Sequence, residues 1–165
     1  NKERTQIRSG QVGADNGFEH YLLKFDGVVE HKVNGEVFGD PKGFGRMEYA
    51  YYLMAKDAGI NIMHSELLLE GERAHFITKR FDRVANEKIH FSLLCAMDHA
   101  DFKKPGSYSY EQLISVARQL RLPRKDAVEI FRRMVFNVIA RNHDDHTKNT
   151  GFLLRKNSQQ WRLSP

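Results

Sequence analysis

Residues 142–149 read Asn-His-Asp-Asp-His-Thr-Lys-Asn, a stretch that gathers two acids, two imidazoles, a lysine and two amides. The plainest interpretation is a solvated turn after a helix, in which His143 and His146 favour the negative end of the helix dipole. Packing rarely needs such a dense set of groups, because each polar group in a core must find a partner. The stretch therefore indicates a functional site, and a fold that brings further groups to it.

Two residues of this stretch, Asp144 and Asn149, have the spacing D-x-x-x-x-N. In protein-kinase catalytic loops this spacing places a carboxylate beside the attacking hydroxyl and an amide oxygen on a metal ion. We expect Asp144 to accept the proton of the hydroxyl and Asn149 to offer a neutral oxygen to Mg²⁺. Lys148 is expected to stabilise the transferring phosphoryl group. The loop therefore predicts phosphoryl transfer from ATP, with Asp144 and Lys148 catalytic and Asn149 a metal ligand.

A cation for the ATP phosphates is expected on a strand of the first half, paired with a glutamate from the helix that follows. Lys24 lies inside the apolar run Tyr-Leu-Leu-Lys-Phe at residues 21–25, where a charge is costly without a partner. Glu48 lies near the start of an expected helix at residues 46–58. The simpler interpretations are a strand-edge lysine that reaches water and a first-turn acid that favours the helix dipole. The order of the two residues along the chain favours the pair.

The run Thr-Lys-Arg-Phe-Asp-Arg at residues 78–83 ends the last expected strand of the first half, where a nucleotide-binding hinge would lie. We expect backbone groups of Lys79, Arg80 and Phe81 to bind the adenine edge. Asp82 is expected to bind a ribose hydroxyl. The simpler alternative is an Arg–Asp surface pair that closes a strand.

The order of the elements predicts an α+β fold with the two lobes of a protein kinase. Residues 1–85 are expected to form a small mixed lobe with strands at 18–25, 63–69 and 73–81, a polar loop at 26–45, and the helix at 46–58, which Gly59 ends. Residues 86–165 are expected to form a mostly helical lobe that carries the catalytic loop.

The second half contains several local signals for helices and turns. Ser109 and Gln112 form a capping box at the head of one helix, and Pro123 opens the next. Segments 151–155 and 160–163 are typical of a hairpin. In the later helix a buried stripe is expected from Ala127, Ile130, Phe131, Met134, Val135, Val138 and Ile139, with Arg124, Lys125, Arg132 and Arg133 in solvent.

The composition is that of an ordinary soluble globular protein, with 165 residues of which 41% are hydrophobic and 28% charged. The formal charge of +5 comes from 26 basic residues interspersed with 21 acidic ones, so it says little about partners. No apolar run approaches the roughly 20 residues needed to span a bilayer. The single cysteine, Cys95, is expected to be a buried inert thiol. We therefore expect a cytoplasmic protein with no membrane partner.

At this point the chain resembles the HipA-like serine/threonine kinases, the toxins of bacterial toxin–antitoxin pairs, over nearly its whole length. The resemblance rests on the runs at residues 21–25, 48–49, 79–83, 108–113, 141–149 and 161–165. It implies that Asp144 is the catalytic aspartate, Asn149 a Mg²⁺ ligand and Lys24 the lysine on the ATP phosphates. It also implies an adenine hinge at 79–81, a ribose contact at Asp82, and ATP and Mg²⁺ as cofactors. The implied partners are a protein substrate, by analogy a component of translation, and a DNA-binding antitoxin, with DNA contacted only within that complex.

Two parts of the family pattern are missing from these 165 residues. The family has a glycine-rich phosphate loop before the segment at which this chain starts, and Ser9-Gly10 with Gly13 are no convincing substitute. The family also has a Tyr-Asp pair with a second metal-ligating aspartate after the Leu-Ser-Pro at which this chain ends. The chain begins on Asn1 without a methionine, so we expect a piece truncated at both ends. Such a piece is expected to bind ATP and Mg²⁺ poorly and to transfer phosphate slowly or not at all.

Two other classes of function compete with the kinase. His143 and Asp144 also read as the adjacent pair of an HD-type metal phosphohydrolase, which uses a metal-activated water. That site needs an earlier histidine, for which His99 is the candidate, and a later aspartate, and none follows Asp145. A non-enzymatic nucleic-acid-binding module would use basic helices, but the chain lacks a recognisable binding motif.

Overall fold

The structure is a computed structural model that describes residues 6–10, 17–28, 30–31, 37–38, 41–102, 104 and 106–165. The chain forms two compact units, Asn1–Arg80 and Phe81–Pro165. The first unit contains most of the expected small lobe and the second contains the catalytic loop. Each unit is a mixture of helices and strands, and the assignment of the units to kinase lobes stays a prediction.

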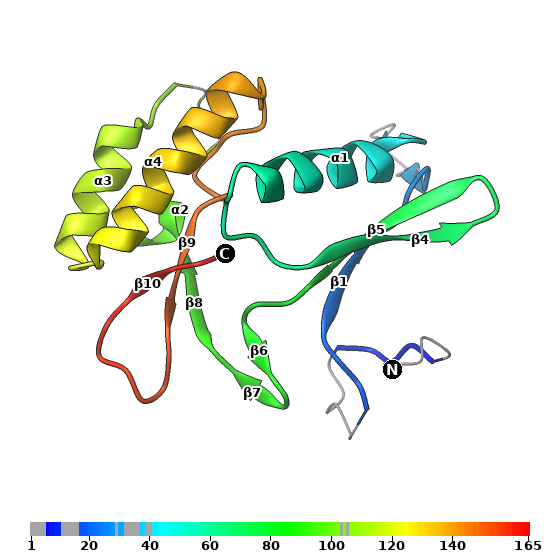
Figure 1. The fold of residues 1–165 in the computed structure, drawn as a ribbon, viewed down its shortest axis with the longest axis horizontal. Helices are drawn as coiled ribbons and strands as arrows, with labels where there is room; N and C mark the ends of the chain where they lie inside the picture. Colours follow the sequence, from blue (N-terminus) through cyan, green and yellow to red (C-terminus); the bar gives the residue numbers. More distant parts are fainter. Residues whose placement is uncertain are drawn as a thin grey trace. The chain divides into compact units, whose positions relative to one another are not determined.

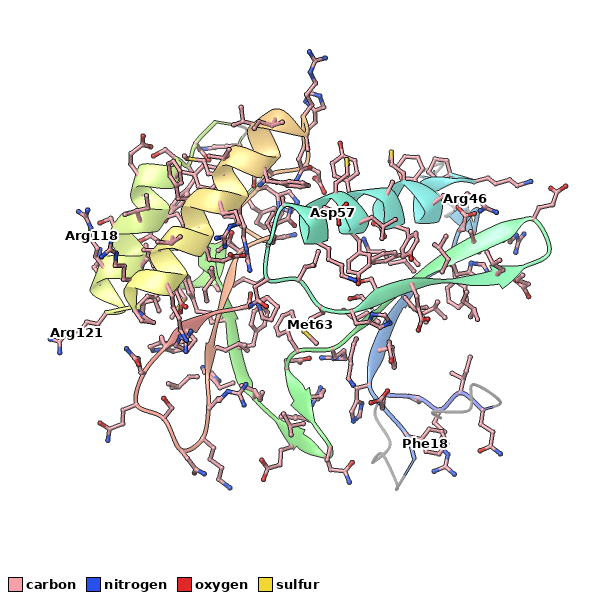
Figure 2. The ribbon with its side chains drawn as sticks, in the orientation of Figure 1. Phe18, Arg46, Asp57, Met63, Arg118 and Arg121 are labelled. Carbon is pink, nitrogen blue, oxygen red and sulfur yellow. The ribbon has the colours of Figure 1, made fainter. Side chains whose placement is uncertain are left out.

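The first unit is built on a three-stranded antiparallel sheet (Figure 1). Its order is β1 (Tyr21–Lys24), β5 (Arg73–Lys79) and β4 (Ser65–Glu70), and helix α1 (Phe44–Asp57) packs against β5 and β4. Short strands β2 (Glu30–His31) and β3 (Val37–Phe38) pair within the segment expected to be a loop. In Figure 2 the labels Arg46 and Asp57 mark the two ends of α1.

Helix α1 lies between two glycines, of which only Gly59 was predicted to end it, and the helix starts at Phe44 rather than at the expected residue 46. Gly43 precedes the helix with a φ of 98°, and Gly59 follows it with a φ of 72°, which are left-handed conformations that favour glycine. Gly45, in the first turn, is required by close packing, because a Cβ there would lie 1.9 Å from the carbonyl oxygen of Ala74 on β5. The start of α1 therefore lies directly on the backbone of the central strand.

A buried carboxylate, Asp26, fixes the same end of α1. Its Oδ1 accepts the backbone N–H of Gly43 at 2.7 Å, and its Oδ2 accepts the N–H of Ala74 at 3.1 Å. These bonds join the segment after β1 to the helix start and to β5. The hydrogen bond from the Ala74 N–H makes the largest contribution to holding the pKa of Asp26 below its ordinary value. Sequence reasoning did not foresee this residue.

The second unit combines a three-stranded antiparallel sheet with two longer helices that lie side by side (Figure 1). Its elements are β6 (Arg83–Val84), β7 (Glu87–Lys88), β8 (His90–Leu93), α2 (Leu94–Met97), α3 (Tyr110–Gln119), α4 (Arg124–Ile139), β9 (Gly151–Leu154) and β10 (Arg162–Leu163). The sheet order is β10-β9-β8, and β6 pairs with β7. A core cluster consists of Leu94, Leu113, Val116, Ala117, Ile130, Phe152 and Leu163.

Two local predictions in this unit are confirmed. The capping box is present, because Ser109 N–H donates to Gln112 Oε1 at 2.8 Å and Gln112 N–H donates to Ser109 Oγ at 3.4 Å. The expected hairpin near the end of the chain is the antiparallel pair of β9 and β10. Cys95, expected to be buried, is a partly exposed free thiol.

The prediction of a buried apolar stripe along α4 was wrong for most of its length. Ile130 is buried, but Phe131 is 56%, Val138 72% and Ile139 77% exposed. The buried face of α4 is instead largely ionic, because Asp126 and Glu129 occupy it with Ile130. The hydrophobic spacing showed which residues of α4 are apolar, but it did not predict which face of the helix is buried.

Ion pairs on this face tie α4 to β10. Asp126 accepts two hydrogen bonds from the Arg162 guanidinium, at 2.8 and 2.7 Å, and the backbone N–H of Leu163 at 3.0 Å. Arg133, expected in solvent, donates to Glu129 at 3.0 Å and to the carbonyl of Ser164 at 2.9 Å.

In the described part of the chain, no helix combines the length and apolar character needed to cross a membrane.

Candidate active site

The loop that is expected to be catalytic, residues 140–150, connects α4 to β9 and is fixed by backbone hydrogen bonds; it is called the catalytic loop below. The chain turns at Arg141, with a φ of 52°, and the N–H of Asn142 donates to the carbonyl of Asn137 at 2.9 Å. At the far end, the N–H of Leu94 donates to Thr150 at 2.9 Å and the N–H of Cys95 to Thr147 at 3.3 Å. The loop therefore has two anchored ends, one on α4 and one on α2.

Asp144 and Asn149 lie together in this loop, as their spacing predicted. The side-chain amide nitrogen of Asn149 donates to the Asp144 carbonyl, so its Oδ1 is left as the atom that could meet a cation. The Asp144 side chain is 86% exposed, and His146 Nε2 lies 3.4 Å from its Oδ1. An exposed carboxylate beside an amide oxygen suits both an incoming hydroxyl and Mg²⁺.

Lys148 has a different neighbour from the one expected of a phosphoryl-stabilising cation. Its Nζ lies 3.3 Å from the centroid of the Phe102 ring, a cation–π contact with the segment before α3. This contact holds the lysine side chain against the segment before α3. Its role on the phosphoryl group stays a prediction.

Sequence reasoning missed a polar residue that contacts the loop from α3. The hydroxyl of Tyr110 donates to Asp145 Oδ2 at 2.7 Å and accepts from Asn137 Nδ2 at 2.9 Å. Burial, and then the bond to Asp145, raise the pKa of the Tyr110 phenol far above its ordinary value. In the sequence, Tyr110 was marked only by its place in the run at residues 108–113. That run contributed to the family resemblance but indicated no role for Tyr110.

A cavity of about 290 Å³ lies against the catalytic loop within the second unit. Its walls include Asp144 and Thr147 from the loop, Tyr110 from α3 and Leu94 from α2. Thr147 is only 7% exposed, and its buried Oγ1 finds no hydrogen-bond partner among the described residues. A buried polar atom without a partner suggests that a ligand or water completes this wall.

In the first unit, Lys24 and Glu48 form the expected ion pair, with Lys24 Nζ donating to Glu48 Oε1. The lysine side chain is 58% exposed and the glutamate 29%. Glu48 Oε2 is buried and finds no hydrogen-bond partner among the described residues. The pair therefore presents a cation that solvent, or a phosphate, can reach.

The backbone of the expected hinge is partly used within the fold. The N–H of Lys79 donates to His64 and that of Arg80 to His20, both at 2.9 Å. The Lys79 side chain bonds to Glu19 Oε1 at 2.6 Å, which raises the pKa of Lys79. The N–H groups of Lys79 and Arg80 are therefore used within the fold, and the adenine contact of residues 79–81 stays a prediction.

Asp82 shows the pairing that the simpler interpretation predicted. Its carboxylate lies 3.8 Å from Arg83 Nε, and its side chain is 20% exposed. Its carbonyl accepts the N–H of Ile89 at 3.0 Å. The ribose contact at Asp82 stays a prediction.

The predicted residues divide between the two units. The first unit contains Lys24, Glu48, Lys79 and Arg80, and the second contains Phe81, Asp82, Asp144, Lys148 and Asn149. An HD-type phosphohydrolase would need several histidine and acidic ligands around one metal. The described residues contain no such group of three histidine, cysteine or acidic side chains.

Comparisons with known proteins agree with this geometry. The model of the HipA-like C-terminal domain family matches residues 2–165. Among solved structures, the chain is similar to HipA of Shewanella oneidensis MR-1, determined with HipB and its operator DNA. The TM-score is 0.60 at 17% identity, over 98% of this chain and 44% of that HipA chain. The likeness shows a shared fold, and this chain spans less than half of that protein. A search of curated proteins found no match.

Proposed function

The chain belongs to the family of HipA-like C-terminal domains, and from that premise we propose that it is the phosphoryl-transfer part of a serine/threonine protein kinase. Its two units are then the two lobes of a kinase-like fold. The observation that carries the proposal is the catalytic loop, in which Asp144 is exposed and Asn149 is bonded to its carbonyl. The D-x-x-x-x-N spacing brings a carboxylate and an amide oxygen into one loop, which supports a role in phosphoryl transfer.

In this proposal the second unit binds the acceptor hydroxyl and accepts its proton. The Asp144 carboxylate orients the hydroxyl of a protein serine or threonine and accepts its proton. The cavity beside it has room for such a side chain, and Thr147 Oγ1 is an unused polar partner in its wall. Asn149 Oδ1 is the neutral oxygen for Mg²⁺. Lys148, which precedes Asn149 in the same loop, stabilises the transferred phosphoryl group.

The proposed nucleotide-binding residues are Lys24, Glu48, Lys79 and Arg80 of the first unit and Phe81 and Asp82 of the second. Lys24 binds the phosphates and Glu48 holds its side chain in place, which matches the Lys–Glu pair that kinases require. Backbone groups of Lys79, Arg80 and Phe81 bind the adenine edge, and Asp82 binds the ribose. ATP supplies the phosphoryl group, and Mg²⁺ neutralises the charge that develops on it.

The wider biology follows from the same premise. HipA of Shewanella oneidensis MR-1 was solved with HipB and its operator DNA. We propose an antitoxin of that kind as the partner of this protein, with DNA contacted only through the complex. A component of translation is the proposed substrate, and the cytoplasm the proposed location.

The test uses the product of the whole reading frame that encodes residues 1–165. With γ-labelled ATP and Mg²⁺ it should place label on serine or threonine of itself or of a protein substrate. Asn149→Ala should raise the Mg²⁺ concentration needed for half-maximal transfer by about tenfold, because one ligand is lost. Asp57→Asn changes an exposed residue at the end of α1 and is the control. A wild-type protein that hydrolyses ATP without labelling any protein hydroxyl would contradict the proposal.

A further inference from the structure

Tyr110, the first residue of α3, is the centre of a chain of side-chain hydrogen bonds that reaches the catalytic loop. Its hydroxyl donates to Asp145 Oδ2 at 2.7 Å and accepts from Asn137 Nδ2 at 2.9 Å. The other end of the Asn137 amide accepts from Asn142 Nδ2 at 3.2 Å. The chain therefore spans α3, α4 and the loop.

The last bond of the chain reaches the proposed catalytic residue. Asn142 Oδ1 accepts the backbone N–H of Asp144 at 3.1 Å. Tyr110 is thus linked to the loop twice, directly through the Asp145 side chain and indirectly through Asn137 and Asn142. These two attachment points lie on consecutive residues, so together they fix the backbone from which the Asp144 side chain extends.

The direction of every bond in the chain follows from the carboxylate at its end. An ionised carboxylate only accepts, so Tyr110 must donate to Asp145 and must accept from Asn137. The Asn137 amide then has one orientation, with its oxygen toward Asn142, whose own oxygen is left for Asp144 N–H. The Tyr110 phenol keeps its proton and stays a donor at neutral pH, because its ordinary pKa of 10.0 is already far above 7 and burial raises that pKa further.

We propose that Tyr110 is a positioning residue for phosphoryl transfer, which holds the Asp144 backbone in the geometry that catalysis needs. The inference rests on the proposed kinase function. Asp144 needs such support because its side chain is 86% exposed and, among the described residues, its carboxylate has one polar contact, the long one with His146 at 3.4 Å. Without Tyr110, Asp145 and the Asn137 amide lose their fixed orientation, and the loop can move away from the acceptor hydroxyl.

The chain offers a matched control two residues away. Tyr108 donates its hydroxyl to Asp98 Oδ2 at 2.7 Å, and burial and that bond raise the pKa of its phenol as well. No hydrogen bond of Tyr108 among the described residues reaches residues 137–149. Tyr108 and Tyr110 both line the cavity, so Tyr108→Phe and Tyr110→Phe remove the same kind of bond at its wall, and among the described residues only the hydrogen bonds of Tyr110 reach the loop.

The experiment compares these two variants in the product of the whole reading frame, at saturating Mg-ATP and protein acceptor. Tyr110→Phe should lower kcat by about 10- to 100-fold, since small displacements of a catalytic group have effects of this size. The KM for ATP should stay within about twofold. Tyr108→Phe should lower kcat less than about threefold, while both variants lower Tm to a similar extent.

A second variant guards against failure of Tyr110→Phe to fold. Asn142→Ala removes the acceptor of Asp144 N–H and should lower kcat to a similar extent, and the double variant should be little worse than either single one. Equal kcat values for Tyr110→Phe, Asn142→Ala and wild type would overturn the inference. If Asp144→Asn were still inactive in that case, the kinase proposal would stand without it. Full activity of Asp144→Asn would instead refute the kinase proposal.

Discussion

The replacement Asp126→Asn tests whether ion pairs, rather than apolar contacts, hold α4 to the end of the chain. Asp126 is 5% exposed and accepts three hydrogen bonds, two from Arg162 and one from Leu163 N–H. Burial alone would raise the pKa of Asp126, but the bonds from Arg162 and Leu163 outweigh it and lower that pKa. Asparagine keeps the shape of the side chain and removes its charge.

The expected loss of stability is about 3 kcal/mol. Hydrogen bonds to charged groups contribute about 1.5–3 kcal/mol each, but asparagine still offers one oxygen to a donor. The Arg162 side chain is 38% exposed, so water recovers part of its lost interaction. Leu163 is buried, and its N–H is costly to leave unpaired.

Trp161 is the only tryptophan of the chain and packs against the core of the second unit beside β10. Its fluorescence during urea unfolding therefore reports the element that Asp126 holds. With a slope of about 1.5 kcal/mol/M, the midpoint should fall by about 2 M. Glu87→Gln, at an exposed acid of β7 in the same unit, should change stability by less than about 0.5 kcal/mol.

The pH dependence of this difference gives a second readout. The folded pKa of Asp126 lies below its ordinary value of 3.8, so its stabilisation is present above that pH and is lost as pH falls through the folded pKa. The gap between wild type and Asp126→Asn should thus be full at pH 7 and shrink below about pH 4. This account of α4 would be refuted if Asp126→Asn were as stable as wild type at pH 7. It would also be refuted if the difference in stability between the two proteins were as large at pH 2 as at pH 7.

Two further substitutions test the first unit. Gly45→Ala should destabilise it by about 3 kcal/mol or more, because the new Cβ would lie 1.9 Å from the Ala74 carbonyl oxygen, whereas Gly10→Ala has nothing within 4 Å and should be neutral by circular dichroism melts. Glu48→Gln should raise the KM for ATP by about tenfold with little change in Tm, since exposed ion pairs contribute less than about 1 kcal/mol. Glu72→Gln breaks the more exposed Lys42–Glu72 pair and should leave that KM unchanged, and equal KM values for both glutamate variants would count against a nucleotide role for Lys24.

Local signals predicted much of the fold. The capping box at Ser109, the glycine that ends α1 and the turn between β9 and β10 depend on residues only a few positions apart. Such features are set by backbone conformation and by nearest neighbours, which a sequence shows directly. The pairing of Lys24 with Glu48 was predicted by a longer argument, from the order in which kinase parts occur.

Features that depend on distant neighbours were missed or wrong. Nothing near Asp26 in sequence indicates that Gly43 and Ala74 would bond to its carboxylate. The apolar stripe on α4 predicted that this face would be buried. The face that packs is instead the one whose side chains bond to Arg162 and to the carbonyl of Ser164. Tyr110 and Asn137 were missed in the same way, because their shared role appears only when α3 and α4 lie side by side.

The most direct test of the account is the single-turnover rate of phosphate transfer by Asp144→Asn, measured at saturating Mg-ATP against wild type. Asparagine keeps the size of the side chain and cannot accept the hydroxyl proton. The account predicts a fall in rate of at least about 100-fold, with ATP still bound. A rate within threefold of wild type would contradict the assignment of Asp144 as the catalytic residue, and with it the proposed function.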